Sequence, residues 1–356
     1  MAIKAETALN ILLIFVPVPI IGQFCGLSPT FVFFTACLGI IPLAGLMGKA
    51  TEHLAERAGT AVGGLLNATF GNACELIIAL AALQAGLVDV VKATITGSII
   101  GNILLVLGAS MLAGGLKYDK QTFNRTAATT SATLLALAAI SLSVPTVFHY
   151  SVINAHLNET KLALAISCVL FTTYFLSLVF SLKTHKNLYV NAFDQDAEAA
   201  MGTTHWDIKK SISILLVATL LVVVLSEYLV NAVEFAAHSV GMSKIFIGVI
   251  LLAIIGNAAE HSTAVLMALK NKMDLAINIA LGSGAQIALF VAPIIVFSSF
   301  LMGMPINLCF SEIEILAVVV SVIILSFVAT DGECNWLEGV QLIAVYLILG
   351  AAFYFA

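Results

Sequence analysis

Long apolar runs, separated by short polar stretches, dominate the chain. Runs of this length and polarity are typical of transmembrane helices. Pro42 and Pro293 should bend the helices in which they lie. The pattern predicts an all-α polytopic membrane protein with eleven transmembrane helices. The runs cover residues 8–27, 29–48, 59–86, 91–115, 127–148, 160–182, 209–240, 244–270, 274–302, 312–330 and 335–355.

The composition agrees with this prediction. Hydrophobic residues make up 61% of the chain and charged residues 10%, and the mean hydropathy is +1.08. No soluble domain needs that balance. There is no basic cluster of the kind that binds nucleic acid, so no nucleic-acid partner is expected. The six cysteines are scattered, and we interpret them as small buried hydrophobic residues and not as zinc ligands. The N-terminus has no small-residue cleavage site, so the first apolar run is expected to be retained.

Positive charges divide unequally between alternating loops. One side has Lys92, Lys161 and Lys244 only. An excess of Lys and Arg marks the cytoplasmic side. The bias therefore predicts a multi-pass protein of the cytoplasmic membrane with its N-terminus in the cytoplasm and its C-terminus outside. The richer side carries Lys4, Lys49, Arg57, Lys117, Lys120, Arg125, Lys183, Lys186, Lys209, Lys210, Lys270 and Lys272.

The longest polar stretch divides the chain into two sets of five predicted helices. We predict an extra N-terminal helix (1–28), a first five-helix repeat (29–182), a cytoplasmic acidic linker (183–208) and a second repeat (209–356). Because five is odd, the second repeat must start from the opposite face of the membrane. This is the inverted-repeat arrangement of secondary transporters, whose sites lie near the midplane where the repeats meet.

The two halves share a motif in register. Gly71-Asn72-Ala73-Cys74-Glu75 is matched by Gly256-Asn257-Ala258-Ala259-Glu260, at an offset of 185 residues (256 − 71 = 185). At the same offset, Gly97-Ser98 is matched by Gly282-Ser283. Each half therefore places one glutamate in the middle of an apolar run.

The repeated glutamates are the first candidates for a functional site. A charged side chain at bilayer depth is costly, so an intramembrane Glu indicates function by default. On a continuous helix Gly71, Asn72 and Glu75 would share one face. Carboxylate, amide and carbonyl oxygens suit a hard divalent cation. The candidate ligands are Gly71, Asn72, Glu75, Gly256, Asn257 and Glu260, with Ser98, Asn102, Ser283 and Gln286 as further ligands or as hydrogen-bond partners of the carboxylates.

An alternative interpretation is helix packing, with small residues for close contact and Asn or Ser for interhelical hydrogen bonds. It accounts well for Gly63, Gly64 and Gly97. It accounts poorly for the two glutamates, since nothing in the third, fourth, eighth or ninth helix is basic enough to pair with them.

Charge balance suggests what the pair does. Two carboxylates neutralise one divalent cation, and two buried anions left close together would be costly. Two protons restore neutrality equally well. The sequence therefore suggests exchange of a divalent cation for protons, with Glu75 and Glu260 binding either in competition.

A second polar stripe lies on the seventh predicted helix. Glu227, Asn231, Glu234 and His238 share one face, and Glu52 is the counterpart of Glu234 at an offset of 182. We consider a hydrated proton pathway through Glu52, Glu227 and Glu234. The alternative is an amphipathic helix end with snorkelling charges.

The segment from Gly63 to Leu76, continued by Gly97–Asn102, resembles the first signature of the calcium/proton antiporters of the cation/calcium exchanger superfamily. The stretches Gly256–His261 and Gly282–Gln286 resemble the second signature. The resemblance implies a two-repeat fold with an extra first helix. It also implies calcium held at Glu75 and Glu260, with carbonyl oxygens and the Asn and Gln amides, and extruded against protons by alternating access.

The resemblance implies a transporter with no cofactor, since calcium is the transported substrate. The long N-terminal tail of the plant and fungal vacuolar relatives is missing, which favours a prokaryotic protein. The acidic stretch Asp194-Gln195-Asp196-Ala197-Glu198 has only three carboxylates, so we expect a solvated linker and not a regulatory calcium site.

Other functions stay open at this point. A sodium/calcium exchanger, or an antiporter for manganese or cadmium, would have similar oxygen ligands, and a passive channel would differ only in lacking uphill transport. An intramembrane enzyme is disfavoured because no His-Glu-x-x-His motif is present. The pattern does not fix the proton stoichiometry, and it leaves a homo-oligomer open.

Overall fold

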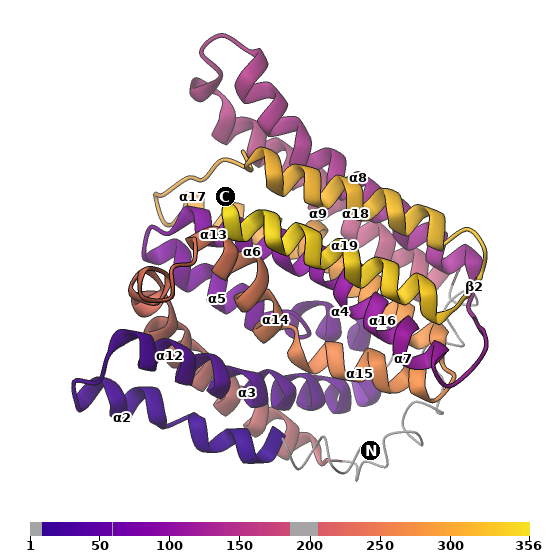
Figure 1. Ribbon diagram of the computed structural model, residues 1–356, viewed down its shortest axis with the longest axis horizontal. Coiled ribbons are helices and arrows are strands. Elements are labelled where there is room, and N and C mark those ends of the chain that lie inside the picture. The colour runs from indigo at the N-terminus through magenta and orange to yellow at the C-terminus, as the bar shows by residue number, and fades with distance from the viewer. Residues whose placement is uncertain (1–8, 59, 186–205) are drawn as a thin grey trace. The chain divides into compact units, whose positions relative to one another are not determined.

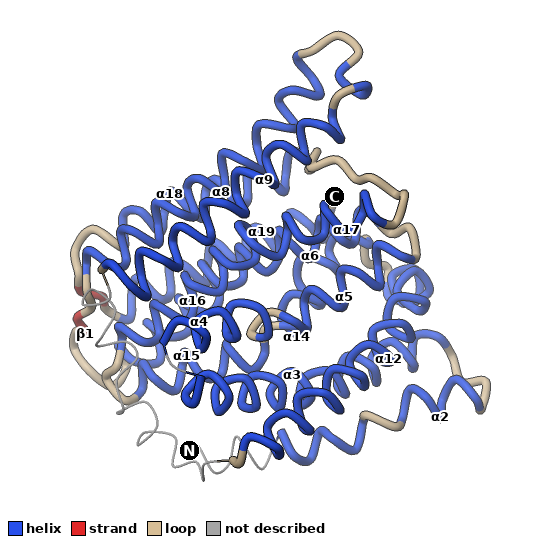
Figure 2. Tube along the Cα trace, turned by 180° about the vertical axis from the view of Figure 1, so that it is seen from behind, coloured by secondary structure: helices blue, strands red, loops and turns tan. Residues whose placement is uncertain are grey.

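The computed structural model describes residues 9–58, 60–185 and 206–356, and these are almost entirely helical (Figure 1). The one sheet in this part of the chain is small: β1 (Gln121–Thr122) pairs antiparallel with β2 (Glu333–Cys334). Figure 2 shows the same chain from behind, with helices in blue and the two strands in red. Residues 186–205 of the predicted linker, with their acidic stretch, lie outside the described residues.

Helices occupy every predicted apolar run. An eighth candidate span is a bent pair, Lys244–Gly256 with Ala258–Leu269, and Leu9–Phe24 and Ala73–Gln84 are shorter apolar helices. The prediction of a helical, multi-pass membrane protein is confirmed, while the count of eleven stays a prediction. Within the described ranges, seven helices are long and apolar enough to cross a bilayer: Pro29–Ala58, Val88–Gly115, Arg125–Ser151, Glu159–Thr184, Ile208–Val240, Met273–Leu301 and Trp336–Phe355.

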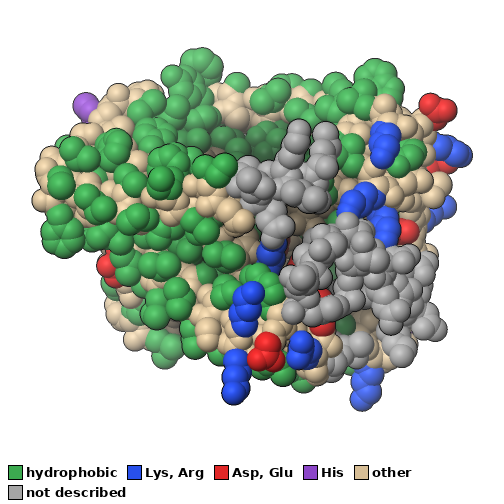
Figure 3. Space-filling view, turned by 90° about the horizontal axis from the view of Figure 1, so that it is seen from below, with side chains coloured by type: hydrophobic (Ala, Val, Ile, Leu, Met, Phe, Trp, Pro, Cys, Tyr) green, Lys and Arg blue, Asp and Glu red, His purple; other side chains and the backbone are tan. Residues whose placement is uncertain are grey.

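Several of these helices keep apolar side chains at the surface. In α9 (Glu159–Val179) and α12 (Ile208–Val240) less than half of the most apolar stretch is buried. Leu176 and Leu220 are examples of large exposed side chains. Figure 3 shows one face on which hydrophobic side chains cover wide areas, with Lys and Arg side chains gathered elsewhere. An apolar surface of this extent is expected where helices contact lipid.

The chain forms two compact units, and each draws on both halves of the sequence. Unit 1 comes from residues 1–91 and 193–260, and unit 2 from residues 92–192 and 261–356. The described helices of unit 1 are η1 (Leu13–Phe15), α2 (Val18–Phe24), α3 (Pro29–Ala58), α4 (Thr60–Phe70), α5 (Ala73–Gln84), α12, α13 (Lys244–Phe246), η6 (Ile247–Leu252) and α14 (Ala253–Gly256).

Unit 1 is organised by α3 and α12, which pack along each other (Figure 1). Gly39 in α3 permits the close approach, because a Cβ atom at this position would lie 2.7 Å from Leu225 Cδ2 of α12. Two further contacts are reciprocal: α5 from the first half packs on α12, and α14 from the second half packs on α3.

In unit 2, too, helices from one half of the sequence pack on helices from the other half. α7 (Leu107–Gly115) packs on α19 (Trp336–Phe355), the last helix of the second half, while α17 (Ala292–Leu301) packs on α9 of the first half. Other helices of unit 2 are η2 (Gly101–Val106), α8 (Arg125–Ser151), η3 (Ala155–Leu157), η4 (Phe180–Thr184), α16 (Met273–Gln286), η7 (Ile287–Val291) and α18 (Glu312–Val328); α6 (Val88–Ile100) and α15 (Ala258–Leu269) run across the unit boundaries.

Candidate functional site

The repeated Gly-Asn motif interrupts two helices. α4 ends at Phe70 and α5 begins at Ala73, while α14 ends at Gly256 and α15 begins at Ala258. The second break bends the chain by 61°. Asn72 (φ −107°, ψ 23°) and Asn257 (φ −94°, ψ 7°) both depart from regular helical angles. The prediction that Gly71, Asn72 and Glu75 share a face of one continuous helix is therefore wrong, because the helix stops between them.

The breaks place both glutamates at helix N-termini. Glu75 is the third residue of α5 and Glu260 the third residue of α15. The first turn of a helix carries unpaired N–H groups and the positive end of the helix dipole, which favour a negative charge there. Secondary transporters use interrupted helices of this kind to build ion sites at the membrane midplane.

Glu75 lies against the backbone of Gly256. A Cβ atom built on Gly256 would lie 3.2 Å from Glu75 Cγ and 3.4 Å from its Cδ and Oε1. The Glu260 carboxylate is close enough to act electrostatically on Glu75. Glu75 is 7% exposed, and its Oε2 atom has no hydrogen-bond partner among the described residues. A buried carboxylate oxygen without a partner is costly unless a cation or a proton satisfies it.

The glycines and asparagines have different surroundings in the two halves. The three atoms nearest to a Cβ at Gly71 all belong to Asn67, so this glycine is tight against its own helix. The Asn257 side chain stabilises the break between α14 and α15, because its Nδ2 donates a hydrogen bond to the Ala253 carbonyl at 2.9 Å. Asn72 is buried and begins α5 as the N-cap residue.

Unit 2 holds the other predicted polar residues. Asn102 Nδ2 donates to Ser283 Oγ at 3.2 Å, while Ser98 is buried and Gln286 is half-buried at the end of α16. The structure thus brings Asn102 and Ser283 into direct contact.

Two π-helical segments begin next to these residues at almost equivalent positions, and the first contains Asn102. η2 begins at Gly101 and η7 at Ile287, one residue beyond the repeat offset (101 + 185 = 286). π-helical turns are frequent at functional sites, because they re-aim the side chains next to them.

The predicted proton pathway maps to unit 1. Glu227 and Glu234 are exposed on α12, and Glu52 is exposed on α3. Glu234 forms an ion pair with Lys244, and both side chains are about half exposed. The alternative of a snorkelling charge therefore describes Glu234 better than it describes Glu227.

Lys92 is counted among the loop charges, although it falls inside the predicted run 91–115, and the structure places it in a helix. Lys92 belongs to α6, and its Nζ donates to Asn307 Oδ1 at 2.8 Å and to the Cys309 carbonyl at 2.7 Å. The expectation that no residue of the third, fourth, eighth or ninth helix is basic enough to pair with the two glutamates is not contradicted by these contacts and stays a prediction. The side chain is engaged by the segment after α17.

A buried carboxylate on α18 also escaped the sequence analysis. Glu314 is 4% exposed and accepts a hydrogen bond from Thr96 Oγ1 at 3.3 Å. A signal was present, because Ser311 three residues earlier forms a capping box with Glu314. That signal indicates a structural role at the start of α18.

Comparison with known proteins identifies the family. The sodium/calcium exchanger protein family matches residues 28–183 and 210–355. The chain belongs to this family. The Ca(2+)/H(+) antiporter of Aphanothece halophytica is 48% identical, with 97% of this chain and 95% of that protein covered. The Ca(2+)/H(+) antiporter ChaA of Bacillus subtilis is 43% identical, with 95% and 96% covered.

Solved structures agree with the fold. A structure of native YfkE has a TM-score of 0.85 at 39% identity, with 98% of this chain and 99% of that chain covered. The H+/Ca2+ exchanger CAX has a TM-score of 0.71 at 13% identity, covering 100% and 93%, and supports the fold alone.

Proposed function

We propose that the protein exchanges cytoplasmic calcium for protons across the cytoplasmic membrane by alternating access. One observation carries the proposal: Glu75 is a buried carboxylate that lies against Gly256, beside Glu260, with one oxygen unpartnered among the described residues. Relatives that are 43–48% identical over nearly the whole chain are Ca(2+)/H(+) antiporters.

Glu75 and Glu260 provide the charge for calcium in this proposal. Two carboxylates balance one divalent cation, and calcium takes several oxygen ligands in a flexible arrangement. The interrupted helices add carbonyl oxygens near Gly71 and Gly256, and Asn72 and Asn257 add amide oxygens. Ser98, Asn102, Ser283 and Gln286 of unit 2 stay predictions, as further ligands or as hydrogen-bond partners of the carboxylates.

Protons compete for the same two carboxylates. When calcium leaves, the two neighbouring carboxylates repel each other and the buried Glu75 carries an uncompensated charge, and protonation removes both costs. The same pair thus binds one calcium ion or two protons, and each turnover exchanges one for the other.

We also propose that protons reach the pair along α3 and α12. Glu227 is exposed on α12 and follows a stretch, residues 211–226, that has no charged side chain. A carboxylate at this depth is costly in lipid, so an exposed one is expected to face water. Glu52 and Glu234 extend the pathway toward the helix ends. The N-terminus is cytoplasmic and the C-terminus outside in this orientation, following the positive-inside rule.

Calcium uptake into liposomes tests the proposed function. Purified protein is reconstituted and an imposed pH gradient, without sodium, drives uptake of radioactive calcium. Wild type should accumulate calcium against its gradient, while Glu75→Gln and Glu260→Gln should each abolish uptake. Glu312→Gln, an exposed carboxylate at the start of α18, is the matched control and should behave as wild type. Full activity in either site variant would contradict the assignment, and uptake that requires sodium would point to a sodium/calcium exchanger.

A further inference from the structure

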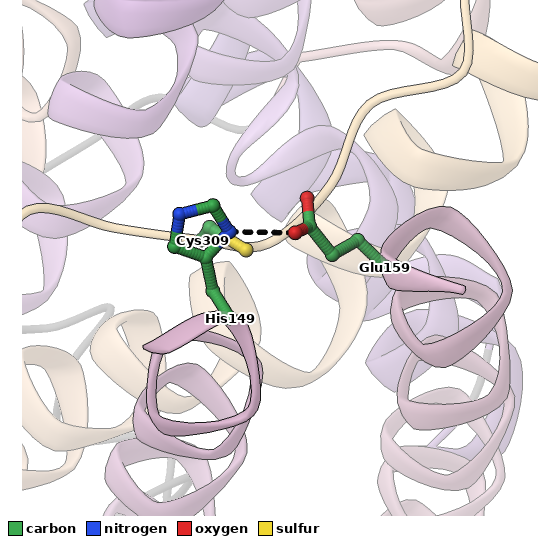
Figure 4. A group of neighbouring side chains, drawn as sticks. All are labelled: His149, Glu159 and Cys309. Carbon is green, nitrogen blue, oxygen red and sulfur yellow. Dashed lines mark hydrogen bonds and ion pairs between the residues drawn. The ribbon is translucent and has the colours of Figure 1, made fainter. Parts of the chain in front are cut away.

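Three side chains with different metal-ligating atoms meet in unit 2. His149 comes from the end of α8, Glu159 from the start of α9 and Cys309 from the segment that joins α17 to α18 (Figure 4). Their ligand atoms all lie within 4.8 Å of one another. His149 Nδ1 and Glu159 Oε1 are 2.6 Å apart. Neither exchange of calcium nor the proposed proton pathway uses any of the three.

The Glu159 carboxylate is oriented by a hydrogen bond to its second oxygen. Asn307 Nδ2 donates to Glu159 Oε2 at 2.8 Å, and Lys92 Nζ in turn donates to Asn307 Oδ1. The other oxygen, Oε1, faces His149. In protein metal sites the ligating carboxylates are themselves hydrogen-bonded to neighbouring side chains, which fixes their orientation. Glu159 has such a hydrogen bond from Asn307.

The spacing suits a tetrahedral ion. Zinc binds His, Glu and Cys at about 2.0–2.3 Å, which puts ligand atoms about 3.4 Å apart. The contact between His149 and Glu159 would have to lengthen by less than about 1 Å, and Cys309 Sγ, which lies within 4.8 Å of both ligand atoms, would move in by about 1.4 Å at most. The His149 side chain is 46% exposed, so an ion and one water molecule have access.

We propose that His149, Glu159 and Cys309 form a binding site for a borderline-soft divalent ion such as Zn2+. Nitrogen, oxygen and thiolate ligands together select for such an ion over calcium, which prefers oxygen alone. This departs from the expectation that all six cysteines are inert hydrophobic residues. The bound ion joins the consecutive helices α8 and α9 to the segment before α18, which lies about 150 residues further along the chain.

Cobalt binding tests the site without any transport measurement. Co2+ alone is titrated into the purified full-length protein, and the thiolate-to-cobalt charge-transfer band in the near ultraviolet is recorded. Wild type should show the band, Cys309→Ser should lack it, and His149→Gln and Glu159→Gln should bind about tenfold more weakly or worse. Cys168→Ser and His185→Gln, which change an exposed cysteine and an exposed histidine of the same unit, are matched controls and should keep the band. No band in wild type, or an unchanged band in Cys309→Ser, would overturn the proposal.

A consequence for transport rests on the proposed function. An ion that ties three elements together should slow the motions of alternating access, so Zn2+ on both sides of the liposome should inhibit calcium exchange. Cys309→Ser should resist this inhibition, which also separates the site from competition at Glu75. If cobalt binds but zinc does not slow wild-type exchange, the claim that the ion acts as a clamp fails. If wild type shows no exchange at all, the proposed function fails and the binding result stands.

Discussion

The side chain of Glu75 packs against the backbone of Gly256, with Oε1 3.4 Å from where a Cβ atom of that residue would lie. Each belongs to a different copy of the repeated motif. The glycine of the second copy therefore makes room for the glutamate of the first, which explains why a residue without a side chain precedes the break.

Gly256→Ala should displace the Glu75 carboxylate. A methyl group at 3.2 Å from Cγ forces the side chain to shift, and overpacking of this kind costs about 1–3 kcal/mol. We expect calcium affinity to fall about tenfold, measured by equilibrium binding to purified protein. Gly48→Ala is the control, since no atom lies within 4 Å of its Cβ position. Equal affinities of the two variants would show that the contact does not position Glu75.

The proposed proton pathway predicts how strongly each of three Glu→Gln substitutions slows transport. Glu227→Gln should slow proton-driven calcium uptake several-fold, because an exposed acid on an apolar helix is expected to face water and relay protons. Glu234→Gln should have a smaller effect, since Glu234 is held in an exposed ion pair with Lys244. Glu52→Gln should resemble Glu227→Gln. Stopped-flow recording of a pH dye inside liposomes measures all three, and wild-type rates in every variant would rule the pathway out.

Close backbone contact in unit 2 predicts a stability effect. A Cβ atom at Gly339 of α19 would lie 2.4 Å from Leu112 N and 2.6 Å from the Gly108 carbonyl oxygen. Backbone atoms cannot rotate away, so Gly339→Ala should destabilise the fold by about 3 kcal/mol. Thermal unfolding in detergent should show a clear drop in Tm. Gly282→Ala, which has open space around its Cβ position, should leave Tm within error, and a similar Tm for both would contradict the packing.

Cys309 predicts a pH-dependent reactivity. Burial, and next the Glu159 carboxylate, raise the pKa of the Cys309 thiol to about 11, while Lys92 acts in the opposite direction. Because the thiolate is the reactive form, the alkylation rate should rise about tenfold per pH unit between about pH 7 and 10. Peptide mass spectrometry after timed labelling measures it. Glu159→Gln removes a negative charge and should speed labelling at a given pH; an unchanged rate would show that Glu159 does not act on the thiol.

The sequence predicted the helical membrane fold and the repeated glutamates, because long apolar runs and rare intramembrane charges are direct signals. It did not predict the helix breaks. Gly71-Asn72 and Gly256-Asn257 occur inside uninterrupted apolar runs, where composition alone fits a continuous helix.

The pattern of apolar and polar residues also does not predict contacts between segments that are distant in the sequence. Lys92 bonds to Asn307 and Cys309, and Asn307 bonds to Glu159, only because the fold brings their segments together. Single residues of this kind have no periodicity, so nothing local distinguishes them from ordinary loop charges. The π-helical turns after Ser98 and Gln286 are likewise set by packing.

Proton release on calcium binding tests most directly whether Glu75 and Glu260 are shared between the two substrates. Calcium is titrated into purified protein in buffers of different ionisation enthalpy, and calorimetry gives the number of protons released per ion bound. Wild type should release up to two protons per calcium at low pH, and Glu75→Gln or Glu260→Gln should lower both the release and the affinity. Calcium binding with no proton release at any pH, or release unchanged in both variants, would contradict the account.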